Sequence, residues 1–231
     1  KSYNDGNRMG AYTNGAGKTS TFKSKNEFYL GLKAKSGWGF FGQAVANFKT
    51  YNDSTFNKHY MGDPSLTITH PTLYDDGTVK ITGQLRQYFP VSDYSVQYGT
   101  YQTAYYNNIH AKLKNKNDVL NFLIPRYFTQ KSYSPTATLW YVEDRTILQH
   151  NVNPHWRFGI QQWSQLENHT VAPTGISVEV IPFFDYMFSS TAFIGPRLSF
   201  PVFVNGGPVY EGPTNVSTNN AQAELFFQAT L

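Results

Sequence analysis

The chain has 231 residues, of which 17 % are aromatic and only 15 % are charged, and its net charge is +4. Cysteine is absent, which excludes a disulfide-bonded scaffold, a zinc site built on thiolates and a thiol nucleophile. No run of about 18 apolar residues occurs, which excludes a transmembrane helix, and the scattered lysines and arginines are not typical of a nucleic-acid binder.

Apolar and polar residues alternate along nearly the whole chain, and no segment shows a helical period. Because successive side chains of a strand point to opposite faces, this pattern predicts β-strands. In chain order, the predicted strands are Arg8–Asn14, Glu27–Ala34, Trp38–Lys49, Ser65–Tyr74, Val79–Phe89, Tyr94–Leu113, Val119–Thr129, Thr136–Thr146, Trp156–Gln161, Ile176–Tyr186, Ala192–Val202 and Ala221–Leu231.

Short and long connections alternate between these strands. The short turns are Lys35–Gly37, Asp75–Gly77, Asn115–Asp118, Gln149–Asn153 and Ser189–Thr191. The long loops are Gly15–Lys25, Thr50–Pro64, Glu167–Pro173 and Asn205–Asn220, whereas Pro90–Asp93 and Gln130–Pro135 are short on the same side. Four prolines inside predicted strands require bulges or early strand ends, because each removes a ladder hydrogen bond: Pro125, Pro182, Pro196 and Pro201.

The last stretch, Ala221–Leu231, is an amphipathic strand that runs to the final residue. It resembles the ending of bacterial outer-membrane proteins, which finish on such a strand closed by a bulky apolar residue, usually Phe, where this chain has Leu231. The resemblance implies an all-β fold: one antiparallel up-and-down transmembrane β-barrel of about 12 strands over residues 1–231. We expect short periplasmic turns, longer external loops, both termini on the periplasmic side, and contact with outer-membrane lipid and lipopolysaccharide.

In such a barrel the polar face of each strand points inward. We therefore predict a porin-like channel for small polar solutes and ions, with a weak anion preference because basic residues slightly outnumber acidic ones inside. The predicted pore-lining residues are Lys33, Lys80, Arg86, Arg126, Arg157, Arg197, Glu179, Asp185 and Glu224. An aromatic girdle at the membrane interfaces is predicted from Trp38, Tyr74, Phe89, Trp156, Tyr186, Phe188 and Phe227.

Motifs for catalysis are weak. Gly15–Thr19 resembles a phosphate loop, but position 12 is Tyr where the motif needs Gly. The six histidines lack the spacing of metal ligands. A lipid hydrolase would need a nucleophilic Ser near His169, and Asn168–Thr170 has none. Paired carboxylates for glycoside hydrolysis could come from Glu143, Asp144, Glu179 and Asp185, but the sequence does not give the distances between them. We expect no enzyme activity, no cofactor, no metal and no nucleic-acid partner; a homo-oligomer is left open.

Two alternatives belong to other classes. In the first, the barrel does not conduct, because Phe41, Phe183 and Trp163 fall on the polar face and close the lumen, and its role is structural or adhesive. In the second, the chain is a soluble carbohydrate-binding β-sandwich with Tyr and Trp as stacking platforms.

Overall fold

The computed structural model describes residues 7–14, 18–49, 58–131, 137–171, 174–189, 192–205 and 222–229. Its strands form one antiparallel sheet, and the helix α1 (Asp93–Tyr98) is the single helix of the described residues. The strands are β1 (Asn7–Asn14), β2 (Lys18–Lys33), β3 (Gly39–Lys49), β4 (Lys58–Met61), β5 (Ser65–Thr69), β6 (Tyr74–Asp75), β7 (Val79–Tyr88), β8 (Tyr101–Lys112), β9 (Asn117–Thr129), β10 (Thr138–Asn151), β11 (Trp156–His169), β12 (Gly175–Ser189), β13 (Ala192–Asn205) and β14 (Gln222–Ala229). The predicted all-β antiparallel fold is confirmed.

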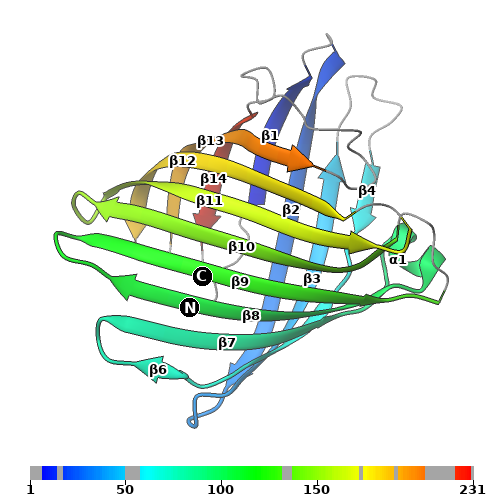
Figure 1. Cartoon of the computed structure of the whole chain (residues 1–231), viewed down its shortest axis with the longest axis horizontal. Helices are drawn as coiled ribbons and strands as arrows, with labels where there is room; N and C mark the ends of the chain where they lie inside the picture. Colours follow the sequence, from blue (N-terminus) through cyan, green and yellow to red (C-terminus); the bar gives the residue numbers. More distant parts are fainter. Residues whose placement is uncertain are drawn as a thin grey trace.

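The fourteen strands fill twelve positions in the sheet. β4 and β5 both pair with β3, and β5 and β6 both pair with β7, so these three short strands share one position. From β7 onward each strand pairs with the next along the chain. β1 pairs with β2 and with the last strand, β14, and β2 also pairs with β3. Figure 1 shows the strongly curved sheet, with β7–β12 passing in front of β1–β3.

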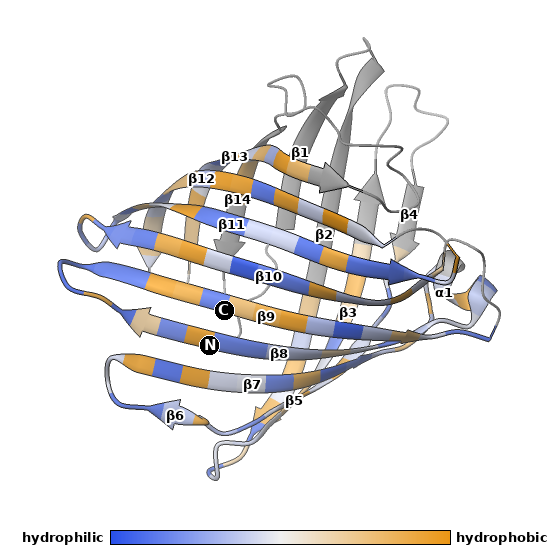
Figure 2. Ribbon diagram, in the orientation of Figure 1, coloured by the Kyte–Doolittle hydropathy of each residue, from blue (hydrophilic) through white to orange (hydrophobic). Residues whose placement is uncertain are grey.

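The two faces of the sheet have opposite character, and their burial is the reverse of that in a soluble protein. Apolar side chains on one face are exposed: Leu30 is 85 % exposed and Phe28 64 %. Charged side chains on the other face are buried: Arg86 is 7 % exposed, Glu143 3 % and Asp185 0 %. We call these the outer and the inner face, and Figure 2 shows the alternating bands along β7–β12.

The inner face is not wholly polar. A small hydrophobic cluster lies on β8 and β9, made of Ala104, Tyr106, Leu120, Phe122 and Ile124. Ala104 is fully buried and Leu120 is 2 % exposed. Part of the inner face is therefore covered by packed apolar side chains.

The short turns lie at one end of the sheet, as predicted. They follow β2, β6, β8 and β10, and β1 begins and β14 ends at the same level, since Asn7 pairs with Phe227. At the turn after β2, Gly37 has a φ of +91°, a conformation that glycine adopts without steric cost. In the turn after β8, Asn115 and Lys116 both have positive φ.

The predicted strand Tyr94–Leu113 is wrong over its first part, where α1 forms instead. The Ser92 side chain accepts a hydrogen bond from the Ser95 N–H, and Gly99 ends the helix in the left-handed conformation. Asp63 accepts further hydrogen bonds from the N–H groups of Val91 and Ser92. Six residues are too few for a helical period to stand out, so alternation was the wrong signal here.

Several strand bounds also differ from the prediction. β2 begins at Lys18 inside the predicted loop Gly15–Lys25, because it pairs with β1 through residues such as Phe22 and Lys23. β4 lies inside the predicted loop Thr50–Pro64, and β11 continues to His169. The sequences of these segments show no clean alternation of apolar and polar residues, so backbone pairing extends the strands where the sequence pattern gives no signal.

The prolines lie within strands as predicted. Pro201 pairs with Glu179, directly beside a register shift between Val178 and Glu179, so the bulge expected at a strand proline is present there. Pro125 pairs with Val142 across β9 and β10 without such a shift. Among the described residues, no helix is long and apolar enough to cross a membrane.

Candidate functional site

Glu143 is the centre of the first charged cluster on the inner face. It lies on β10, and the Nη2 atom of Arg126 on β9 is 3.3 Å from its Oε2. Arg145, two residues further along β10, donates to Oε1, and the indole N–H of Trp163 on β11 donates to the same atom at 2.8 Å. Three donors from three strands thus hold one carboxylate, and the two guanidinium groups compensate its charge.

Tyrosine rings lie between the arginines of this cluster. The guanidinium carbon of Arg126 is 5.4 Å from the ring centre of Tyr106 and 5.3 Å from that of Tyr141. The guanidinium carbon of Arg86 is 4.7 Å from the Tyr106 ring centre. Tyr106 therefore contacts two cations, an arrangement that the negative face of an aromatic ring stabilises. Its hydroxyl oxygen is 2.9 Å from that of Tyr88.

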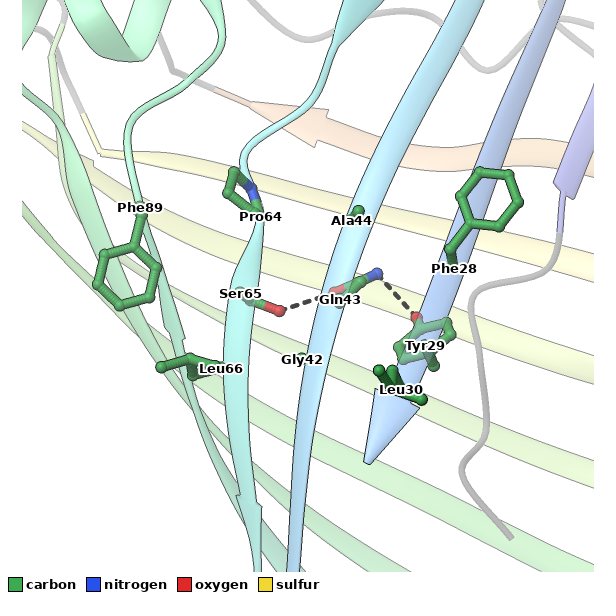
Figure 3. A pocket seen from close by; sticks show the side chains of 10 residues that line it. All are labelled: Phe28, Tyr29, Leu30, Gly42, Gln43, Ala44, Pro64, Ser65, Leu66 and Phe89. Carbon is green, nitrogen blue, oxygen red and sulfur yellow. Dashed lines mark hydrogen bonds between the residues drawn. The ribbon is translucent and has the colours of Figure 1, made fainter. Parts of the chain in front are cut away.

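Arg86 on β7 lies beside a polar chain that crosses three strands. Ser65 donates to the Gln43 side-chain carbonyl at 2.8 Å, and the Gln43 amide donates to the Tyr29 hydroxyl at 2.8 Å, as the dashed lines in Figure 3 show. Arg86 Nη1 is 3.4 Å from the same Gln43 oxygen and 3.2 Å from the Tyr88 hydroxyl. All these partners are neutral.

Asp185 is the centre of the second charged cluster, nearer the short turns. Arg157 on β11 donates to its Oδ2 from Nε at 3.0 Å, and Arg197 Nη2 on β13 is 2.9 Å from Oδ1. Phe193 lies under Arg157 and Phe183 under Arg197, with guanidinium carbons 4.6 and 4.4 Å from the ring centres. The carboxylate is fully buried between two cations.

The predicted pore-lining residues fall into three groups. Arg86, Arg126, Arg157, Arg197, Glu179 and Asp185 lie on the inner face, where Glu179 accepts a hydrogen bond from Ser199 at 2.6 Å. Lys33 and Lys80 are exposed near the short turns, and Lys80 is 3.3 Å from Asp75. The side chain of Glu224 lies outside the described residues. That these residues line a pore stays a prediction.

The sequence reasoning missed Glu143 and Arg145 as lining residues. They alternate with Val142, Asp144 and Thr146, of which two are polar, so β10 shows no clean apolar face. Tyr141, Glu143 and Arg145 are two residues apart and therefore lie on the same face of a strand. That spacing is the signal that could have identified them.

Polar residues also interrupt the outer face. Asn121 on β9 donates to Asp144 at 2.6 Å and lies 2.9 Å from the Thr146 hydroxyl on β10. Because Asp144 has the parity opposite to Glu143, this group lies on the same face as the exposed Leu148. The outer face thus carries hydrogen-bonded polar side chains among its apolar ones.

A shallow apolar groove lies on the outer face over β2, β3 and β5. Gly42 and Ala44 form its floor, and Phe28, Leu30 and Leu66 stand at its sides (Figure 3). The groove exists because β3 carries small residues between strands that carry large ones.

The predicted girdle residues lie mostly near the short turns. Trp156 contacts Tyr186, whose ring in turn meets Phe188 edge-on at 5.2 Å. Trp38 and Tyr74 are exposed beside turns, with Trp38 edge-on to His70. Phe89 lies towards the other end, against Tyr101, and the side chain of Phe227 is outside the described residues. Their position at a membrane interface stays a prediction.

The aromatic residues proposed as a plug do lie on the inner face. Phe183 covers Gly159, Phe41 covers Gly31 and Gly39, and Trp163 is held by Glu143.

The motifs considered for catalysis gain no support as a group. No cluster of three His, Asp or Glu side chains within the described residues could hold a metal ion. His169 lies 3.4 Å from Glu167 and 3.4 Å from the Thr138 hydroxyl. Residues 15–17 of the phosphate-loop motif lie outside the described residues, and Lys18 begins a strand.

No protein-family model matches the chain, and no curated protein matches it in sequence. Among solved structures, its fold is similar to that of the COG4313 outer membrane channel from Pseudomonas putida F1. The TM-score is 0.63 at 11 % sequence identity, over 98 % of this chain and 91 % of that one. The resemblance to outer-membrane β-barrel proteins is therefore confirmed at the level of the fold.

Proposed function

We propose that the chain is an outer-membrane channel: a closed twelve-position β-barrel through which small polar solutes and ions diffuse passively. The observation that carries the proposal is the reversed burial, with Leu30 and Leu32 exposed on one face and Asp185 buried on the other. Exposed apolar side chains are stable when acyl chains cover them. The pairings of β1 with β14 and of β2 with β3 support closure, because together they leave no free edge between the first and last strands.

The proposed channel prefers anions weakly. Four arginines lie within ion-pair distance of two carboxylates, Glu143 and Asp185; Arg86 adds a further positive charge and Glu179 a further negative one. Fixed charge acts on permeating ions through the field that it sets in the pore. The short turns and both chain ends would then face the periplasm, as in bacterial barrels, with outer-membrane lipid and lipopolysaccharide around the outer face. No enzyme activity is part of the proposal.

A non-conducting barrel is the second candidate, favoured by the apolar cluster of Leu120 and Phe122 on the inner face together with Phe41 and Trp163. In that case the barrel would have a structural or adhesive role.

The experiment is reconstitution of the purified protein into planar bilayers, after testing that it fractionates with the outer membrane and migrates differently on gels when heated. We expect discrete conductance steps, with the anion over cation permeability ratio reduced in the double variant Arg86→Gln, Arg197→Gln. Membrane insertion without steps would support the non-conducting barrel. A protein that stays soluble without detergent would contradict both candidates and favour the soluble β-sandwich.

A further inference from the structure

Arg86 differs from the other inner-face arginines in its partners. Arg126 and Arg145 contact Glu143, and Arg157 and Arg197 contact Asp185. Within the described part of the chain, no carboxylate lies within ion-pair distance of Arg86. A buried charge without a counter-charge is costly, so such a group is retained where something else compensates it.

The surroundings of Arg86 suit an anion. Its hydrogen bonds with described residues come from Nη1, to Gln43 and Tyr88, whereas Nε is buried without a partner. A guanidinium group presents five N–H donors, and two of them in parallel match the two oxygens of an oxyanion. The hydroxyls of Tyr88 and Tyr106 lie beside it and hydrogen-bond to each other, which leaves one of the two O–H groups as a further donor.

The side chain of Arg86 is also held in position before any anion binds. Its guanidinium lies over the Tyr106 ring, and Gln43, which it contacts, is itself held by Ser65 and Tyr29. Arg86 and Gln43 are 7 % and 5 % exposed, so little side-chain freedom would be lost on binding.

We propose that Arg86 is the centre of a binding site for a small oxyanion, a carboxylate or a phosphate, on the inner face. This inference rests on the proposed function only in that the inner face borders a water-filled space. It also specifies the class of solute that would bind in that space. Arg86 would bind oxyanions, whereas the net charge would attract anions in general.

The test is calorimetric titration of the folded, detergent-solubilised protein with inorganic phosphate and, separately, with acetate. We expect saturable binding of at least one of them, weakened by about tenfold or more in Arg86→Gln, since charge-assisted hydrogen bonds are lost. Arg86→Lys keeps the charge but loses the paired donors, so it should bind the anion more weakly than the wild type does. It also serves as the test variant if Arg86→Gln does not fold. Lys35→Gln, which removes an exposed charge in the turn after β2, is the matched control and should bind as the wild type does.

Wild-type binding of phosphate alone would identify a phosphate site, and of acetate alone a carboxylate site. Absence of binding to the wild type, or equal weakening by Arg86→Gln and Lys35→Gln, would overturn the proposal. Conductance in planar bilayers separates the two claims. Conductance without saturable binding removes the oxyanion site and leaves the channel, whereas binding without conductance removes the channel and leaves the site.

Discussion

Arg197 on β13 forms an ion pair with Asp185 on the neighbouring strand β12, with its Nη2 atom 2.9 Å from Oδ1 of the carboxylate. Arg157 reaches the same carboxylate from β11, on the other side. Asp185 is fully buried, so its charge is compensated by two cations from two neighbouring strands. This pair of contacts ties three strands together on the inner face.

Removing the carboxylate leaves both guanidinium groups without their counter-charge. We expect Asp185→Ala to lower the free energy of unfolding by about 3–5 kcal/mol, the range measured when one partner of a buried ion pair is deleted. Urea-induced unfolding from lipid vesicles measures it, with Asp75→Ala at an exposed ion pair as the control. Equal, small effects of the two variants would show that the Asp185 cluster does not hold the strands together.

Glu143 compensates Arg126 and Arg145. Glu143→Gln keeps the size of the side chain and frees two positive charges, so in the proposed channel the anion over cation permeability ratio should rise. The reversal potential under a KCl gradient measures it. An unchanged reversal potential would place Glu143 away from the path of the ions.

Two glycines on different strands, Gly195 on β13 and Gly42 on β3, should respond oppositely to alanine. A Cβ at Gly195 would collide with the backbone oxygen of Phe184 and with Asp185, so Gly195→Ala should cost about 1–3 kcal/mol of unfolding free energy. At Gly42 the nearest atom, the Leu30 oxygen, is 3.8 Å away, so alanine fits. Gly42→Ala should be neutral or stabilise by about 0.5–1 kcal/mol, and the reverse ranking of the two variants would contradict the strand register.

Asp76 stabilises the turn before β7 in a pH-dependent manner. Its carboxylate accepts hydrogen bonds from the N–H groups of Val79 and Thr78 at 2.6 and 2.8 Å, which lower its pKa below the usual range. A lowered folded-state pKa stabilises the protein above the unfolded-state pKa of about 3.9, and this contribution is lost as the pH falls through the folded-state value. The stability difference between wild type and Asp76→Ala should therefore be present at neutral pH and shrink below about pH 4. A constant difference across this range would rule out the carboxylate as its source.

Much of the fold could be predicted from alternation. Val79–Phe89 alternates cleanly, and β7 forms there. The start of β2 could not be predicted, because Lys18–Lys25 shows no alternation and forms a strand by pairing with β1. The helix α1 depends on the Ser92 and Gly99 caps at its two ends, which a search for periodicity does not weigh.

The candidate site was predictable only as a list of inward positions. Arg86 and Arg197 are both predicted to point inward. In the structure, however, Arg197 has a carboxylate partner, whereas Arg86 has only neutral partners among the described residues. That difference depends on which residues meet across strands: Asp185 pairs with Arg157, 28 positions away in the sequence. Register over such separations depends on bulges, such as the shift beside Glu179, that leave no clear mark in one sequence.

The central claim is that lipid covers the outer face, and Leu85 offers the most direct test. It lies mid-strand on β7 between Ile68 and Tyr105 and is 46 % exposed. In a membrane, Leu85→Arg should lower the free energy of unfolding from phospholipid vesicles by about 2–4 kcal/mol. Val171→Arg, at a 74 % exposed site between β11 and β12, should change it by less than about 0.5 kcal/mol. If Leu85→Arg is as stable as the wild type, or more stable, the outer face lies in water and the account is wrong.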